Sequence, residues 1–298
     1  MREERAAAAV AVLLALGLGA LPFGARRRAP SPSPVLWFGG DVHYGDEEGP
    51  LFTGPLPPGP WVVNLEGPLD ASPGGSSSER LRNHPRGLHR LREAGVVAVS
   101  IANNHAGDNG PAGALETARA ARSVGLVPFG LEAGVGLLSV RGHTVSLASF
   151  DLRRGVPEEL PSTVQAMPGT AVVALHDTAP ARYLPSPTLR EAARVALASG
   201  ARVVVSHGTH SVAPVERRGG AVVAFGLGNL RFACGCSRDD EGMALGVRLG
   251  RPSRAWVLPV DAGLGAEPAR LARDPEAFFA LLRALGRPVP HRGGVGFF

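Results

Sequence analysis

From Val35 onward, short apolar runs alternate along the chain with segments of helical periodicity. Apolar runs of four to eight residues between turn residues predict strands, and apolar residues spaced three or four apart predict helices. Repeated alternation of the two favours an α/β fold. The predicted strands cover 35–39, 61–65, 96–101, 137–149 in two pieces, 171–175, 202–206, 221–227, 243–249 and 255–260, and the predicted helices cover 85–94, 111–124, 188–199 and 275–285.

Residues typical of helix ends and loops support this division. Gly125 follows the helix predicted over 111–124, and glycine readily takes the left-handed conformation that ends a helix. Ser186-Pro187-Thr188 is a suitable cap for the helix over 188–199. Stretches rich in Gly, Pro and Ser at 43–60, 70–83 and 151–169 predict surface loops. With no internal repeat or shift in composition, we expect one domain over 35–298.

An uncharged apolar stretch occupies residues 6–24, about the length of one membrane-spanning helix. No small-residue cleavage site follows it, so an uncleaved anchor over 1–28 is favoured over a removed signal peptide. An Ala-rich disordered leader is the alternative. Arginines flank both ends and nearly balance, which leaves the orientation open. We expect a membrane-anchored protein whose domain lies outside the cytoplasm, joined by a stiff Pro-rich linker at 29–34.

The net charge of +5 is concentrated at the N-terminus. All 31 basic residues are Arg; residues 1–28 hold five of them and two acids, a net of +3. The rest of the chain has 26 Arg against 24 acids, a net of only +2. Nucleic-acid binding requires a basic stripe on the folded domain, so we expect no nucleic-acid partner.

Cys234 and Cys236 are the two cysteines of the chain. Two cysteines one residue apart make neither a disulfide framework nor a thiolate zinc site. We expect a pair of small, half-buried loop residues; a redox-labile pair in an exported protein is the alternative.

Five predicted strands each end in a side chain that can bind a metal ion: Asp41, Glu66, Asn104, His176 and His207. Polar groups in such apolar surroundings are costly unless something pairs with them. Ligand sites in α/β sheets lie at the carboxyl ends of the strands. The sequence therefore predicts that these groups meet in one metal site.

Neighbouring residues extend this prediction. His43 lies two positions after Asp41, and in an extended strand such side chains point the same way, so both can reach one ion. His210 follows His207 within one turn. His105 points away from Asn104 and is the candidate proton donor. We expect Asp108 to cap the helix near Pro111.

Other polar residues receive a structural interpretation. His84, His89 and His143 belong to no constellation and are expected to be structural or solvated. The arginines around Asn83 predict a solvated face, with a patch for an anionic substrate as the alternative. They are Arg80, Arg82 and Arg86.

The ordered set D-x-H, E, N-H, H and H-x-x-H resembles the metallophosphoesterase (calcineurin-like) pattern. Three departures resemble the CapA-like capsule or poly-γ-glutamate biosynthesis branch: Glu66 in place of a bridging Asp, Asn103 in place of Gly, and the spacing of the last two histidines. The matching stretches are NLEGPL (64–69), SIANNHAGDNG (100–110), VVVSHGTHSVAPVE (203–216) and AFGLGNLRF (224–232). The chain departs from that branch after His176, where HDTAP replaces the usual Trp-Gly and an acidic residue.

The resemblance implies a four-layer α/β/β/α sandwich with two divalent metal ions. Mixed nitrogen and oxygen ligands without thiolate suit Mn, Fe or Zn. The implied ligands are Asp41, His43, Glu66 and His210 for one ion, and Glu66, Asn104, His176 and His207 for the other. His105 would donate a proton, Glu216 would support the site from behind the ligands, and Asn229 would line the cleft.

These implications define the expected function: a metal-dependent hydrolase-like protein acting on a phosphoester or anionic polymer in capsule, poly-γ-glutamate or cell-envelope biosynthesis. The membrane and other capsule or polyglutamate synthesis proteins are the expected partners. One alternative is a non-catalytic, membrane-tethered scaffold for polymer synthesis or export. Another is a secreted phosphoesterase unrelated to capsule.

Overall fold

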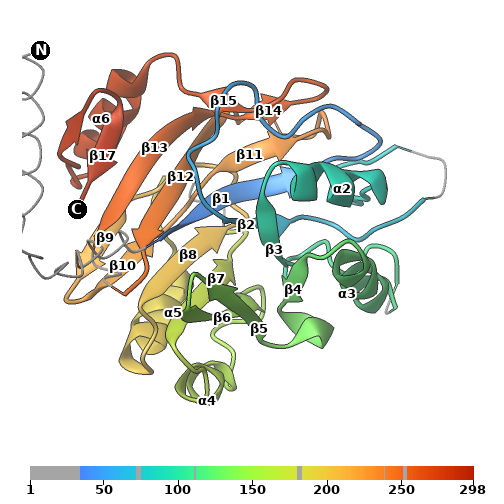
Figure 1. Cartoon of the computed structure of the whole chain (residues 1–298), viewed down its shortest axis with the longest axis horizontal. Coiled ribbons are helices and arrows are strands. Elements are labelled where there is room, and N and C mark those ends of the chain that lie inside the picture. Colours follow the sequence, from blue (N-terminus) through green and yellow to red (C-terminus); the bar gives the residue numbers. More distant parts are fainter. Residues whose placement is uncertain (1–33, 72–74, 111, 180–182, 238, 251–253) are drawn as a thin grey trace, which may run out of the picture. The chain divides into compact units, whose positions relative to one another are not determined.

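The computed structural model describes residues 34–71, 75–110, 112–179, 183–237, 239–250 and 254–298. In this described part, two sheets and five α-helices form a mixed α/β fold, as predicted (Figure 1). The helices are α2 (Arg86–Glu93), α3 (Gly113–Ser123), α4 (Leu160–Gln165), α5 (Pro187–Ala198) and α6 (Pro275–Ala284), with a 3₁₀ turn η1 (Leu131–Ala133). The strands are β1 (Val35–His43), β2 (Trp61–Leu65), β3 (Val96–Ser100), β4 (Val127–Phe129), β5 (Gly136–Val140), β6 (His143–Asp151), β7 (Thr170–His176), β8 (Val203–His207), β9 (Val215–Arg218), β10 (Ala221–Ala224), β11 (Asn229–Phe232), β12 (Glu241–Arg248), β13 (Ala255–Asp261), β14 (Gly263–Leu264), β15 (Arg270–Leu271), β16 (His291–Arg292) and β17 (Val295–Phe297).

Parallel strands at the centre of both sheets run toward one edge. The large sheet of 11 strands has the order β16-β17-β13-β12-β1-β2-β3-β4, with β11, β14 and β15 joined beside this path. The small sheet of six strands has the order β5-β6-β7-β8-β10-β9. Pairing is parallel from β1 to β4 and from β6 to β8, so the carboxyl ends of these strands gather polar residues at one edge.

Three apolar cores determine how the sheets and helices pack. One core contains residues of both sheets, such as Phe38 of β1 and Val172 of β7, so the sheets pack face to face. On the other face of the large sheet, Leu88 of α2 packs in a second core. Leu189 of α5 and Val173 of β7 belong to a third core on the other face of the small sheet. Helices therefore cover the outer face of each sheet, and the core between the sheets fixes the edge where the polar residues meet.

The four predicted helices are confirmed as α2, α3, α5 and α6, and Ser186 caps α5 by accepting from the Leu189 N–H at 3.0 Å. Sequence patterning missed α4, which lies inside the predicted loop at 151–169. It also ended the first strand too early, since β1 continues through Gly39-Gly40 to His43. A Cβ atom at Gly40 would lie 2.0 Å from the Gly228 carbonyl oxygen, so glycine is required where β1 passes that turn.

Contacts divide the chain into 1–33 and 34–298. The predicted membrane anchor at 1–28, and all but the last residue of the predicted linker at 29–34, lie outside the described residues. Among the helices that the structure describes, none is long and apolar enough to cross a membrane.

Candidate metal centre

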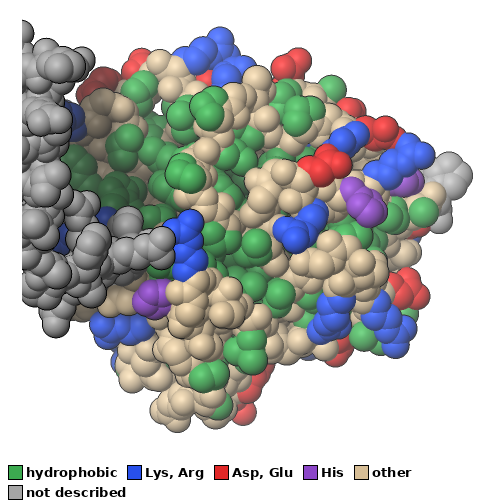
Figure 2. Space-filling model, viewed as in Figure 1, with side chains coloured by type: hydrophobic (Ala, Val, Ile, Leu, Met, Phe, Trp, Pro, Cys, Tyr) green, Lys and Arg blue, Asp and Glu red, His purple; other side chains and the backbone are tan. Residues whose placement is uncertain are grey.

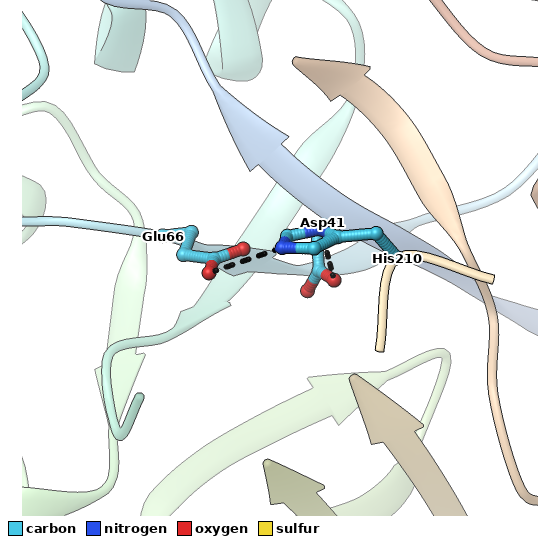
Figure 3. A group of neighbouring side chains, drawn as sticks. All are labelled: Asp41, Glu66 and His210. Atoms are coloured by element: carbon cyan, nitrogen blue, oxygen red, sulfur yellow. Dashed lines mark ion pairs between the residues drawn. The ribbon is translucent and has the colours of Figure 1, made fainter. Parts of the chain in front are cut away.

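Asp41, Glu66 and His210 converge at the carboxyl edge of the large sheet (Figure 3). Asp41 lies in β1, Glu66 directly follows β2, and His210 lies in the turn after β8. His210 Nδ1 is 3.4 Å from Asp41 Oδ2, and its Nε2 is 3.8 Å from Glu66 Oε1. One potential ligand atom from each residue lies within 4.8 Å of the other two, close enough to hold one ion.

The two carboxylates of this cluster are buried, and their pKa values are shifted in opposite directions. Asp41 Oδ1 accepts from Asn64 Nδ2 at 2.8 Å and Oδ2 from the Gly208 N–H at 3.0 Å. Burial alone would raise the pKa of Asp41, but nearby imidazoles and the Gly208 N–H lower it. Burial and the charge of Asp41 raise the pKa of Glu66 well above its usual range. Among the described residues, Glu66 Oε2 is buried without a hydrogen-bond partner, an arrangement that a cation would satisfy.

Asn229 fixes the orientation of His210. The Asn229 amide nitrogen donates to Ser237 Oγ at 3.0 Å and to the Asp239 carbonyl at 2.9 Å. Its Oδ1 therefore faces His210 Nδ1 at 2.9 Å and accepts the proton there. Nε2, on the far side of the ring, faces Glu66, and a hydrogen bond at the other nitrogen is how metal-binding histidines are usually oriented. The sequence placed Asn229 in the cleft but did not reveal this contact.

His207 is oriented in the same manner. Its Nε2 donates to the Gly39 carbonyl at 3.2 Å, which leaves Nδ1 as the nitrogen with a lone pair. Burial lowers the pKa of His207 and favours the neutral, metal-binding form. Gly208 follows with φ +98°, and a Cβ atom there would lie 2.7 Å from His176 Nε2. Only glycine lets this turn bring its N–H to Asp41 beside the His176 ring.

Asn104 and His176 meet on the other side of Glu66. His176 Nε2 lies 2.7 Å from Asn104 Oδ1 and 4.0 Å from Glu66 Oε1. Burial lowers the pKa of His176 to about 3, so the ring is neutral at ordinary pH. Its Nδ1 is also buried without a hydrogen-bond partner in the described part of the chain. The structure thus brings Asn104, His176 and Glu66 together, and their role as ligands stays a prediction.

His43 is placed differently from the prediction. Its Nε2 donates to the Arg82 carbonyl at 2.9 Å, and its Nδ1 accepts from the Cys234 N–H at 3.2 Å. Both ring nitrogens are therefore engaged away from the cluster. The spacing of Asp41 and His43 could not reveal this, because the partners come from two distant loops, at Arg82 and at Cys234. His43 instead ties together two loops.

Asp108 does not cap a helix, contrary to the prediction. The N-cap of α3 is Ala112, and no side chain caps it. Asp108 Oδ2 instead accepts from His105 Nδ1 at 2.6 Å and from the Leu81 N–H at 2.7 Å. The carboxylate accepts the Nδ1 proton of His105, fixes the orientation of the ring and leaves Nε2 free to face a substrate. This pairing is suited to a proton donor, the role that the sequence assigns to His105.

His105 and His210 both line a cavity of about 310 Å³. Its other lining residues are Ser78, Leu81, Phe232, Cys236, Ser237 and Asp239. Cys234 and Cys236 form a disulfide, with Cys234 buried and Cys236 exposed, so they are a bonded pair and not merely two small loop residues. The open cavity gives a ligand access to the cluster.

Glu216 takes part in ion pairs that the sequence did not reveal. Glu216 lies in β9, and its carboxylate accepts from Arg218 at 2.7 Å and from Arg287 at 2.9 Å. Its carboxylate is occupied by these two arginines, and its support of the site stays a prediction. The implied role rested on a match to a family motif. In the structure, Glu216 forms its ion pairs on β9, the edge strand of the small sheet.

The arginines near Asn83 are paired with acids. Figure 2 shows basic and acidic side chains interspersed around α2. Arg80 and Arg86 are exposed and Arg82 is buried, which fits a solvated face only for the first two. The pairs are Arg80 with Asp70, Arg82 with Asp46 and Arg86 with Glu48. Such neutralised arginines do not favour the alternative of an anionic-substrate patch.

Asn64 and Asn103 support the cluster from behind, a role that the sequence did not reveal. Asn103 Nδ2 donates to Asn64 Oδ1 at 3.4 Å, and Asn64 in turn donates to Asp41. Both are buried. The available signal was Asn64 itself, a polar residue inside the otherwise apolar strand WVVNL.

Comparison with known proteins identifies the family. Residues 60–233 match the family model described as bacterial capsule synthesis protein PGA_cap. The chain belongs to this family, which supports a role in capsule biosynthesis and agrees with the CapA-like resemblance of the sequence. No curated protein matches the chain significantly. A crystal structure of a hypothetical protein from Thermus thermophilus is similar with a TM-score of 0.46 and 16% identity, covering 89% of this chain and 98% of that one.

Proposed function

We propose that this family member is a metal-dependent hydrolase acting on a phosphoester or anionic polymer in capsule, poly-γ-glutamate or cell-envelope biosynthesis. The observation that carries the proposal is the position of Glu66. It lies buried between the pair Asp41–His210 and the pair Asn104–His176, with one carboxylate oxygen unpartnered among the described residues. The finer fold assignment that goes with it is the four-layer α/β/β/α sandwich of the metallophosphoesterase type.

The donor set fits two divalent ions of the Mn, Fe or Zn class. Asp41, Glu66 and His210 would hold one, and Glu66, Asn104, His176 and His207 would hold the other. His43 is left out of the first group because both its nitrogens are engaged elsewhere. When bound, two such ions polarise a phosphoryl or carbonyl oxygen and activate water.

The chain's own residues supply orientation and a proton. Asn64 and the Gly208 N–H hold the two oxygens of Asp41, and Asn229 accepts from Nδ1 of His210 and so directs Nε2 toward Glu66. His105 donates a proton from Nε2 to the leaving group and is left as a neutral imidazole, while Asp108 keeps the hydrogen bond to Nδ1 and holds the ring in place. His105 lines the cavity and can therefore meet a substrate there.

Location and partners belong to the same proposal. The apolar stretch at 6–24 would anchor the chain in a membrane, with the domain outside the cytoplasm. An anionic polymer made at that membrane would be within reach of the cavity. Other capsule or polyglutamate synthesis proteins would be neighbours in the process.

The test combines metal analysis with a substrate panel. The purified full chain should retain Mn, Fe or Zn, gain thermal stability when metal is restored after chelation, and cleave a phosphoester or a γ-glutamyl oligomer. His105→Ala should keep the metal and lose turnover, while the exposed His89→Ala on α2 should keep both. A chain that binds no metal and is not stabilised by it overturns the proposal.

One observation favours the non-catalytic scaffold as second candidate. Asp177, which follows His176, accepts from Ser186 Oγ at 2.7 Å and from the Ala179 N–H at 3.2 Å. Its carboxylate is thus engaged at the start of α5 and is not offered to a substrate. Full complementation of a capsule defect by His105→Ala would favour the scaffold, and failure to complement would favour the enzyme.

A further inference from the structure

A second cavity, of about 810 Å³, lies at the carboxyl ends of β4 and β6. It contains none of the predicted site residues. Its walls combine apolar side chains with charged ones. The residues used below are Leu131, Phe150, Asp151, Arg153, Arg154 and Glu159.

Strand pairing connects this cavity to the metal centre. Asp151, at the end of β6, is the register partner of His176 on β7, and the Leu152 N–H donates to the His176 carbonyl at 2.9 Å. Adjacent strands lie about 4.8 Å apart, so the cavity opens one strand away from the Asn104–His176 pair. The cavity of about 310 Å³ opens onto the metal centre itself, because His210 lines it together with His105. The two cavities share no lining residue, and both lie beside the metal centre.

Leu131 is held in an unfavourable conformation at the mouth of the larger cavity. Its φ is +47°, in the left-handed region, and the residue is 47% exposed. Two other described non-glycine residues have positive φ: Arg141, in the tight turn between β5 and β6, and His210, in the metal cluster. Strain of this kind persists where the surrounding structure enforces it, and it gathers at functional sites.

The charged groups of the cavity define what it can bind. Arg153 is paired with Asp151 at 2.7 Å. Arg154 is exposed and has no carboxylate partner in the described part of the chain, so its guanidinium is available to a carboxylate or phosphate. Glu159, also exposed, repels a densely charged ligand. Leu131 and Phe150 provide apolar surface for a carbon chain. These features favour a repeat with one carboxylate on an aliphatic stem over a polyphosphate.

We propose that this cavity is a polymer subsite: it binds a unit of a carboxylate-bearing chain whose adjoining unit lies at the metal centre, with Arg154 contacting the carboxylate and Leu131 packing on the stem. The proposal rests on the proposed function and names the substrate class for that site. If so, the affinity of the protein depends on the length of the polymer as well as on the unit that lies at the metal centre.

Binding of γ-linked glutamate oligomers of two, four and eight units, fluorescently labelled at one end, tests the subsite. Anisotropy is measured on the full chain after chelation, so that no turnover interferes, and metal content is measured separately. We expect the eight-unit oligomer to bind about 10-fold more tightly than the two-unit oligomer. Arg154→Ala should remove most of this gain, Arg154→Lys should retain part of it, and the exposed Arg119→Ala on α3 should leave it unchanged.

Leu131→Gly is a second test variant, and we expect it to fold, so that a loss of binding cannot be put down to unfolding. Glycine relieves the strained φ and deletes the apolar contact, so the melting temperature should rise while the gain with oligomer length falls. The subsite proposal is overturned if the gain in affinity with oligomer length is the same in wild type, Arg154→Ala and Arg119→Ala. It is also overturned if wild type binds no oligomer. Failure of the proposed function appears separately, as a chain that takes up no metal but still shows the Arg154-dependent gain.

Discussion

His105 Nδ1 lies 2.6 Å from Asp108 Oδ2, and the same carboxylate oxygen accepts the Leu81 N–H. A short segment after β3 thus carries both a metal-ligand candidate, Asn104, and a histidine held by a carboxylate three residues later. The Leu81 N–H pins the carboxylate in place. The imidazole is oriented before any substrate arrives, which reduces the reorganisation needed for proton transfer.

Asp108→Asn tests this arrangement. The amide keeps an oxygen for the Nδ1 proton, but a neutral acceptor makes a weaker hydrogen bond than a carboxylate. We expect turnover to fall about 100-fold, because the ring is held less firmly for proton transfer. The measurement is kcat against pH with metal content determined for each preparation. Glu158→Gln, an exposed carboxylate elsewhere, is the matched control. Loss of metal together with activity would contradict a role in proton transfer.

Asn229→Ala should weaken metal binding without removing a ligand. The variant loses the acceptor for Nδ1 of His210, so the ring can adopt the other tautomer or turn away. Removal of such supporting groups typically weakens metal affinity about 10- to 100-fold. Competition with a chromophoric chelator measures the change. Asn109→Ala, whose amide donates to the Leu69 carbonyl at 3.4 Å, should leave affinity unchanged. Equal affinity in the two variants would show that the Asn229 contact does not orient the ligand.

The strand-end residues could be predicted because the physics that brings them together is local. Parallel strands end at one edge, so a polar residue after each apolar run reaches that edge whatever the loops do. Glu66, Asn104 and His176 met in this way. The alternation of apolar strands and helices likewise predicted β2 and α6 to within one residue.

The residues that differed depend on long-range or irregular features. His43 is engaged by the Arg82 carbonyl and by the Cys234 N–H, and Cys234 lies almost two hundred residues later in the chain. Asp108 contacts His105 and the Leu81 N–H instead of capping a helix. The contact with Leu81 joins distant parts of the chain and cannot be predicted without the tertiary fold. The strand β11 and the helix α4 are too short for a periodic pattern to reveal.

Buried histidines predict an acid-sensitive metal-free fold. Burial lowers the pKa of His43 to about 4 and of His176 to about 3, against about 6.5 in the unfolded chain. Because these groups have a lower pKa when folded, their contribution is present above pH 6.5 and is lost as the pH falls toward 4. For His43 alone the loss is about 2 kcal/mol at pH 5.

Urea unfolding of the chelated protein at pH 7.5 and pH 5 measures this loss. In His43→Gln the group no longer titrates, so the difference between the two pH values should shrink by about 2 kcal/mol, even though the variant is less stable at pH 7.5. His89→Gln, at an exposed position of α2, should keep the wild-type difference. An unchanged difference in His43→Gln would mean that this histidine does not resist protonation in the fold.

Glu66→Gln should separate stability from metal binding. The contribution of Glu66 to stability depends on pH in the opposite sense to that of the buried histidines. Burial and Asp41 raise its pKa when folded, so it stabilises the metal-free fold at low pH, and that contribution is lost as the pH rises from about 4.5 through the raised pKa. At pH 8 the neutral amide removes the cost of a second buried carboxylate beside Asp41, and we expect the chelated variant to be about 1–2 kcal/mol more stable than wild type. The same substitution removes the shared ligand, so added metal should stabilise wild type and not the variant. Urea unfolding with and without metal measures both effects, with the exposed Glu93→Gln as control. A variant that is destabilised after chelation yet still stabilised by metal would contradict the bridging position of Glu66.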